Sequence, residues 1–130
     1  MTTTIKYPKS FICDICGRPI EKPDPGLVWW REKDHIFSDF KIIHNLGSCH
    51  KKSDSMLGDG ESAKDNKLDE LQNDIGLSYF LSLPTKEDAN GVRQYRVSPE
   101  SMYLLNRMIC RMFIPGFEEN PSKFFNDRLP

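Results

Sequence analysis

The sequence has no long apolar run. Its 130 residues contain no stretch that approaches the roughly 18 consecutive apolar residues needed for a membrane-spanning helix. The first twenty residues carry lysines and prolines where a secretory signal would have an apolar core. These two absences predict a protein that does not act in a membrane, and we expect it to be cytoplasmic.

The sequence also lacks an excess of charge of either sign. It has 18 Lys and Arg side chains against 19 Asp and Glu side chains. Residues 1–65 hold ten of each sign, and residues 66–130 hold eight basic and nine acidic side chains. General nucleic-acid binders carry a basic excess. We therefore expect a protein partner, and the charge does not favour a nucleic acid.

Cysteines and histidines are few, with four of the former and three of the latter, so their spacing is informative. A protein without a secretory signal is expected in a reducing compartment, where closely spaced cysteines more often bind a metal than form a disulfide. Cys110 stands apart, inside the helical pattern MYLLNRMICRMF. We interpret it as a small hydrophobic side chain.

The strongest chemical signal is the knuckle Cys13-Asp-Ile-Cys16-Gly17. Two thiols three residues apart can face one ion, and the glycine permits the positive φ that such a turn needs. His44 and Cys49 add an imidazole and a thiol and complete a C-x2-C-x27-H-x4-C pattern. Thiolates with an imidazole suit zinc, and four protein ligands leave no position for water. We predict that Cys13, Cys16, His44 and Cys49 bind a structural Zn²⁺ ion.

Three alternatives concern this site. His50 could replace His44 as the fourth ligand, although adjacent Cys49 and His50 would strain the turn. His44 could be an ordinary strand histidine. A redox CxxC of the thioredoxin type needs a helix after the first thiol, whereas Gly17, Arg18 and Pro19 follow Cys16 here. No residue is assigned a catalytic role or the binding of an organic cofactor.

Composition divides the chain into regions that we assign to one domain, residues 1–130. Residues 11–50 are rich in Cys, His and aromatics and form the expected zinc-binding β module. Residues 51–67 are almost all polar and predict a mobile loop. Residues 68–130 show helical periodicity. The predicted fold class is α+β, with a zinc-stapled N-terminal β-hairpin packed on two or three C-terminal helices.

The β module contains one clear strand pattern. Residues 36–44 alternate with a period of two, and residues 27–31 are the expected antiparallel partner across a polar turn at 32–34. Trp29 and Trp30 would then point to opposite faces. We expect one of them in the core and the other exposed as a partner-binding residue.

The helical region contains two apolar stripes. Residues 68–83 carry one, with Leu68, Leu71, Ile75 and Tyr79 at helical spacing, and Gly76 could split this helix. The second helix begins at Ser98-Pro99 and ends before Pro115-Gly116. The remaining expectations are a brief strand at 92–97, a short helix from Asn120-Pro121, and a solvated basic face that includes Arg93, Arg96, Arg107 and Arg111.

Residues 11–50 resemble the small zinc knuckle, treble-clef and zinc-ribbon modules. The resemblance rests on the CxxC-Gly knuckle and on the His44 and Cys49 pair around a hairpin. It implies a compact metal-stapled hairpin. Such modules serve DNA, RNA and protein partners alike, so the resemblance implies no particular function.

The chain is also weakly similar to HNH endonucleases, in which a CxxC knuckle precedes an Asp-His pair, an Asn-Leu stretch and a Cys-His pair. Here the corresponding pairs are Asp34-His35, Asn45-Leu46 and Cys49-His50. The resemblance implies His35 as general base and Asp34 as a ligand of a catalytic ion. The second CxxC of that family is reduced to Cys49.

The sequence as a whole predicts a small non-enzymatic, zinc-binding protein with a binding or regulatory role. The enzymatic alternative is a degenerate HNH-like metal-dependent nuclease. The remaining alternative is a nucleic-acid-binding zinc module, which the near-neutral charge makes less attractive.

Overall fold

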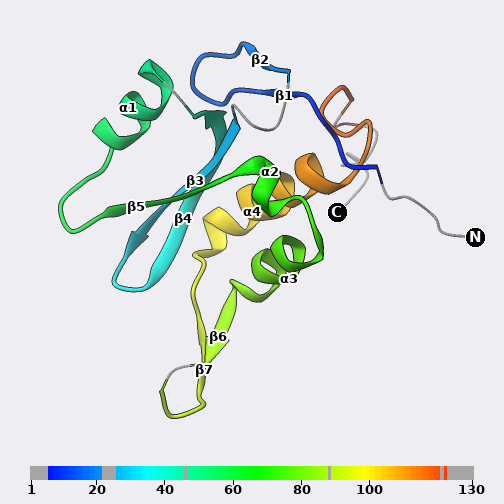
Figure 1. Ribbon diagram of the computed structural model, residues 1–130. Helices are drawn as coiled ribbons and strands as arrows, with labels where there is room; N and C mark the ends of the chain where they lie inside the picture. Colours follow the sequence, from blue (N-terminus) through cyan, green and yellow to red (C-terminus); the bar gives the residue numbers. More distant parts are fainter. Residues whose placement is uncertain (1–5, 22–25, 46, 88, 121, 123–130) are drawn as a thin grey trace, which may run out of the picture.

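The computed structural model describes residues 6–21, 26–45, 47–87, 89–120 and 122. It confirms the α+β class, with antiparallel strands throughout the N-terminal part and the longest helix near the C-terminal end (Figure 1). The elements in chain order are β1 Phe11–Ile12, β2 Pro19–Ile20, β3 Gly26–Lys33, β4 Ile36–His44, α1 Ser48–Ser55, β5 Ser62–Lys67, α2 Leu68–Leu71, α3 Asp74–Ser82, β6 Thr85–Glu87, β7 Arg93–Tyr95 and α4 Pro99–Phe113.

The central element is an antiparallel three-stranded sheet in the order β4-β3-β5. The expected hairpin is present, but β3 extends to Lys33, so the turn consists of Asp34 and His35. Both turn residues have positive φ, 51° and 64°. This conformation suits a two-residue hairpin because it matches the right-handed twist of the strands.

A β-bulge interrupts the hairpin near its middle. Trp29 pairs with Lys41 and Arg31 pairs with Ser38, so two residues of β4, Asp39 and Phe40, lie opposite Trp30. Asp39 adopts a φ of 58° at this point. Aspartate tolerates that conformation better than most residues do. The bulge increases the twist of β4 as it runs toward the candidate site.

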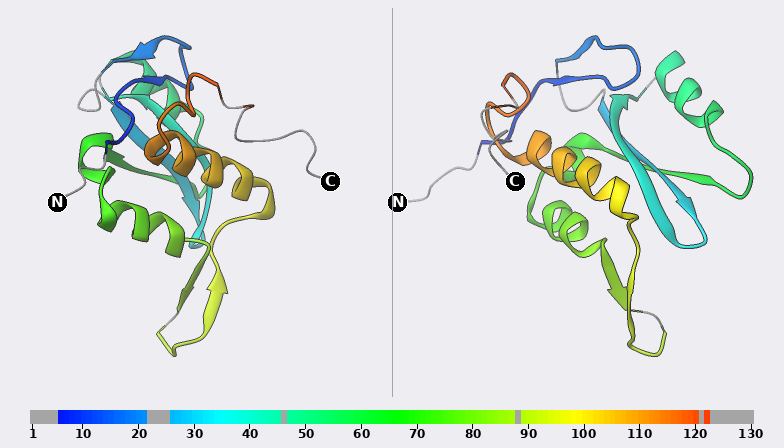
Figure 2. Two further views of the ribbon diagram at one scale, coloured as in Figure 1. Left: turned by 90° about the vertical axis from the view of Figure 1, so that its right-hand side faces the viewer. Right: turned by 180° about the vertical axis from the view of Figure 1, so that it is seen from behind.

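Both tryptophans are buried, so the expectation that one is exposed is wrong. Trp29 faces α1, where its indole Nε1–H donates to the Asp54 carboxylate at 3.0 Å. Trp30 lies on the other face, stacked on Phe40 and edge-to-face with Phe80. Helices therefore cover both faces of the sheet, α1 on one side and α3 and α4 on the other (Figure 2).

The prediction of a polar loop over residues 51–67 is wrong. Its first part belongs to α1, which begins at Ser48, and its last part is β5, which pairs with β3 along its whole length. Hydrophobic periodicity could not reveal β5, because an edge strand is stabilised by backbone pairing and its side chains are nearly all exposed. Only residues 56–61 connect the two elements.

The apolar segment 68–83 is split, but the split precedes Gly76. Helix α2 ends at Leu71, and Asn73 begins α3 by accepting a hydrogen bond from the Gly76 N–H at 2.8 Å. A Cβ on Gly76 would lie 1.9 Å from the Leu71 carbonyl oxygen, so this packing requires glycine. Ile75 is 82% exposed, which places it outside the buried face that the stripe predicted.

The long C-terminal helix α4 follows its prediction, with Ser98 before its first residue and Phe113 at its end. Strand β7 confirms the strand expected within residues 92–97 and pairs with β6. The helix expected from Asn120-Pro121 lies largely outside the described residues.

Candidate metal centre

Four side chains that are far apart in the sequence converge at one end of the hairpin. These are Cys13, Cys16, His44 and Cys49, and one potential ligand atom of each lies within 4.8 Å of all the others. They come from the β1–β2 turn, the last residue of β4 and the first turn of α1. The sequence pattern predicted this cluster, and the structure brings the same four residues together.

The β1–β2 turn positions the first two thiols. The Gly17 N–H donates to the Cys13 carbonyl at 2.9 Å, and Gly17 takes a φ of 74°. Backbone N–H groups also point at the sulfurs, from Ile15 to Cys13 Sγ and from Arg18 to Cys16 Sγ, both at 3.4 Å. The hydrogen bond from Arg18 lowers the pKa of the Cys16 thiol. Such N–H groups stabilise thiolate, the form that binds metal.

The imidazole of His44 is oriented by a backbone carbonyl. Its Nε2 lies 3.2 Å from the Pro19 carbonyl oxygen. Because a carbonyl can only accept, Nε2 carries the proton in this contact. Nδ1 then presents its lone pair toward the sulfurs of Cys16, at 3.5 Å, and Cys49, at 3.7 Å. Metal-binding histidines are commonly held by a hydrogen bond of this kind on the second nitrogen.

Cys49 lies in the first turn of α1, two residues after Gly47, which precedes the helix with a φ of 81°. The thiol is buried. Burial, together with hydrogen bonds shared with the Cys16 and Cys13 thiols, raises the pKa of Cys49 to about 11. Without a cation this thiol holds its proton at neutral pH, so its binding to a metal would release that proton.

The other histidines lie outside the cluster. His50 is on α1 with its Nε2 3.6 Å from a carboxylate oxygen of Asp54 and 3.5 Å from one of Asp65. Asp34 and His35 form the turn at the opposite end of the β3–β4 hairpin. At ~3.3 Å per strand residue, roughly 25–30 Å separate His35 from His44.

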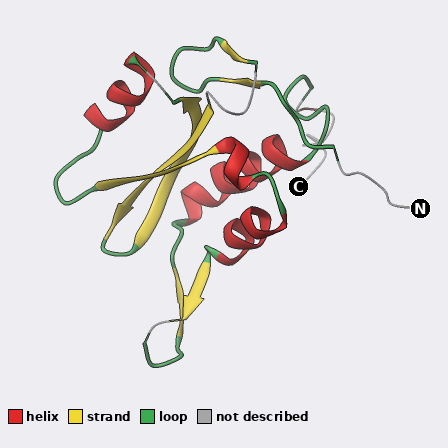
Figure 3. Cartoon of the chain, viewed as in Figure 1, coloured by secondary structure: helices red, strands yellow, loops and turns green. Residues whose placement is uncertain are grey.

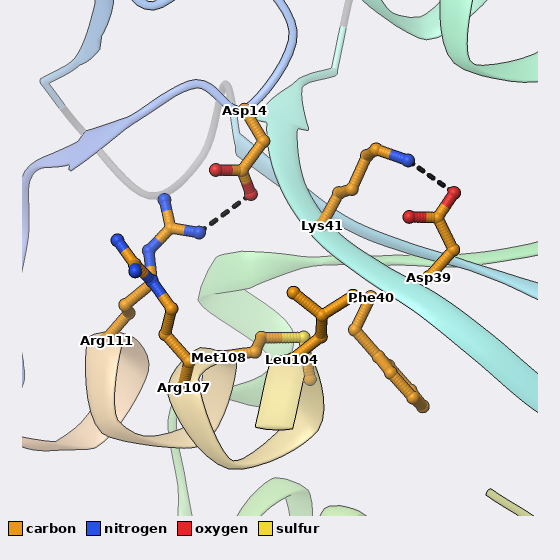
Figure 4. Close-up of a pocket in the computed structure, with 8 residues that line it drawn as sticks. All are labelled: Asp14, Asp39, Phe40, Lys41, Leu104, Arg107, Met108 and Arg111. Carbon is orange, nitrogen blue, oxygen red and sulfur yellow. Dashed lines mark hydrogen bonds and ion pairs between the residues drawn. The ribbon is translucent and has the colours of Figure 1, made fainter. Parts of the chain in front are cut away.

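An ion-pair network around the buried Arg111 joins the knuckle to α4. Arg111 donates through Nη1 to the Asp14 carboxylate at 2.7 Å, through Nη2 to the Ile12 carbonyl at 2.6 Å, and through Nε to Glu118 at 2.9 Å. The Arg111 side chain is only 6% exposed, so its assignment to a solvated basic face is wrong. The close-up shows its guanidinium beside Asp14 (Figure 4). Because 97 positions separate the two residues, no local sequence signal could reveal this contact.

Comparison with family models, with curated proteins and with solved structures finds no match for the chain. Within the described part of the chain, no helix is long and apolar enough to cross a membrane. The Cys13, Cys16, His44 and Cys49 cluster is therefore the feature on which a function can be argued, and it fits a metal-binding protein.

Proposed function

We propose that Cys13, Cys16, His44 and Cys49 bind one structural Zn²⁺ ion and that the protein is a small, non-enzymatic binding or regulatory module. The observation that carries the proposal is the convergence of three sulfurs and one correctly oriented imidazole nitrogen.

The spacing of these atoms supports zinc. In a tetrahedral site with Zn–S of about 2.3 Å and Zn–N of about 2.0–2.1 Å, sulfur and nitrogen lie roughly 3.5 Å apart. The His44 Nδ1 lies 3.5 Å from the Cys16 sulfur and 3.7 Å from the Cys49 sulfur. These side chains therefore need little movement to surround an ion of this size.

A structural role follows from the ligand count. Four protein ligands occupy all the coordination positions of a tetrahedral zinc ion and leave none for water or substrate. The ion would join the β1–β2 turn, the end of β4 and the start of α1. A knuckle followed by a hairpin and a helix that carries the last ligand is similar to a treble clef, which is the class of module we propose here.

A non-enzymatic role is supported by the positions of Asp34 and His35. The nuclease hypothesis needs this pair beside a catalytic cation, but both residues lie in an exposed hairpin turn. In the described part of the chain, neither residue belongs to a group of three or more side chains that could hold a metal ion. We propose another protein as the partner class, because the net charge of −1 gives no general attraction for nucleic acid.

Elemental analysis of the purified protein tests the proposal. We expect one zinc per chain, retained in His35→Ala and lost in His44→Ala, because only His44 faces the sulfurs. A plasmid-cleavage assay with Mg²⁺ or Mn²⁺ provides the functional arm, in which wild type should be inactive. Zinc-free wild type would overturn the metal assignment. Cleavage by wild type that is lost in His35→Ala would overturn the non-enzymatic role.

A further inference from the structure

A groove of about 500 Å³ runs between strand β5 and the helices α2 and α3. Its apolar lining comes from Trp30, Leu71, Ile75 and Tyr79, and its polar lining includes Lys64 and Glu70. The volume is within the range of ligand-binding clefts. We call it the β5 groove, and it is separate from the Cys and His cluster.

The groove borders a free strand edge. Strand β5 is the last strand of the β4-β3-β5 sheet, and on its outer side no strand pairs with it among the described residues (Figure 3). Five of its six side chains are exposed, and Ala63 is half-buried. A free edge presents backbone N–H and C=O groups that an extended chain can pair with.

A buried donor in the lining lacks an acceptor. Trp30 lies next to Lys64 in the sheet register and is 4% exposed, yet its indole Nε1–H makes no hydrogen bond to any described residue. By contrast, the indole Nε1–H of the neighbouring Trp29 donates a hydrogen bond to the Asp54 carboxylate. Buried donors are nearly always paired in folded proteins. An acceptor such as a backbone carbonyl is the kind of partner that this donor lacks.

The charged side chain at the groove that has no ion-pair partner among the described residues is acidic. Lys64 pairs with Glu32 at 3.8 Å, and a carboxylate oxygen of Asp65 lies 3.5 Å from the His50 Nε2. Glu70 has no ion-pair partner within the described part of the chain, and α2 and the start of α3 add Asp69 and Asp74 close by in the sequence. A basic side chain on an incoming peptide would complement this end of the groove.

We propose that the β5 edge binds an extended segment of a partner protein, which adds a strand to the sheet, places an apolar side chain in the groove and positions a basic side chain near Glu70. The inference deepens the proposed function, since it rests on a binding module and names the partner's chemistry. Alternate side chains of an added strand face the same side of the sheet as Trp30 and can enter the groove.

A second copy of this chain is a poorer occupant. Strand β5 carries Lys64, Asp65 and Lys67, and charged side chains, lysine above all, protect edge strands against self-pairing. Pairing with a different sequence meets no such obstacle if its charges complement those of β5.

The test begins with a displayed library of linear ten-residue peptides, selected on zinc-loaded wild-type protein and counter-selected on Ile75→Glu. Ile75 is 82% exposed and lines the groove, so this change should not affect folding. Leu81→Glu is the matched control, because Leu81 is 62% exposed on the same helix and does not line the groove. We expect at least tenfold weaker binding to Ile75→Glu and less than a twofold change for Leu81→Glu.

Backbone pairing is tested on a selected peptide. N-methylation at every second residue removes the donors that face β5, whereas methylation of the intervening residues leaves them intact. We expect the affinity to fall at least tenfold when the donors that face β5 are methylated and to change little when the intervening residues are methylated. Binding should also shift the NMR signals of the amides of residues 62–67. In addition, Glu70→Lys should weaken binding about fivefold at low salt, whereas Glu87→Lys on β6 should not.

Several outcomes would overturn this inference. They are the absence of any peptide that distinguishes Ile75→Glu from Leu81→Glu, equal losses from both methylated sets, and self-association through β5 in sedimentation experiments. Zinc measured in the same samples separates the two proposals. Zinc-loaded protein without peptide binding contradicts only the β5 site, and zinc-free protein that binds the peptide contradicts only the metal assignment.

Discussion

Asp14, which lies between the two cysteines of the knuckle, forms a 2.7 Å ion pair with Arg111 on α4. The same carboxylate oxygen, Oδ2, also accepts a hydrogen bond from the Ile42 N–H of β4 at 2.8 Å. One side chain therefore connects the knuckle to the hairpin and to the C-terminal helix. The candidate metal centre is held by the rest of the fold as well as by any ion it binds.

Replacing Arg111 should be strongly destabilising. Arg111→Ala leaves Asp14 and the 10%-exposed Glu118 without their cation. Removing one partner of a buried pair typically costs about 3–5 kcal/mol. Urea unfolding should show this loss. Arg107 lies one helical turn away and forms no ion pair with the described residues, so Arg107→Ala should change the free energy of unfolding by about 0.5 kcal/mol or less. Similar losses for the two variants would contradict this role.

Substituting a cluster cysteine should affect both metal content and stability. Cys16→Ser should lose the zinc and lower the melting temperature by more than about 10 °C, since structural zinc contributes much of the folding energy of small modules. Cys110→Ala removes a half-buried thiol outside the cluster. It should keep the zinc and cost about 1–3 kcal/mol. Zinc loss from Cys110→Ala would refute the ligand assignment.

The bulge residue Asp39 should contribute to stability above mildly acidic pH. Burial raises its pKa, but hydrogen bonds and charges from Lys41 and Arg31 outweigh burial and lower the pKa overall. A lowered pKa in the folded state means that the stabilisation is present above the unfolded pKa of about 3.9. It is lost as pH falls through the folded value. Asp39→Asn should therefore reduce stability at neutral pH and flatten its decline in acid.

Asparagine is chosen because it keeps the preference for the positive φ of 58° at this position. Asp34→Asn is the matched control, since Asp34 also has a positive φ, 51°, but lies in the exposed turn. Chemical unfolding between pH 2.5 and 7 measures both variants. If the free energy of unfolding of Asp39→Asn declined in acid as much as that of the wild type, the ion pairs of this carboxylate would contribute nothing to stability.

Gly76→Ala should destabilise the contact between α2 and α3. The new Cβ would lie 1.9 Å from the Leu71 carbonyl oxygen, a backbone atom that cannot move alone. We expect a loss of about 2–4 kcal/mol in thermal or urea unfolding. At Gly58 the nearest atom is the Glu61 side-chain oxygen at 3.2 Å, which can shift, so Gly58→Ala should cost about 1 kcal/mol or less. Equal costs would show that α3 can shift freely against α2.

Local sequence patterns predicted the elements and the site whose signals come from residues close together in the sequence. The alternation of residues 36–44 predicted β4, the Ser98-Pro99 start predicted α4, and the Cys and His spacing predicted the cluster. The polar strand β5 and the burial of both tryptophans depend on which surfaces meet after folding. The Asp14 and Arg111 pair is of the same kind, because its partners lie 97 positions apart.

The central claim is that three thiolates and one imidazole bind a single zinc ion. X-ray absorption at the zinc edge of the purified wild-type protein measures this most directly. We predict a first shell of three sulfurs at about 2.3 Å and one nitrogen at about 2.0–2.1 Å, with one zinc per chain. The nitrogen contribution should disappear in His44→Cys and persist in His50→Ala. A first shell dominated by oxygen, or one that depends on His50 and not on His44, would contradict the account.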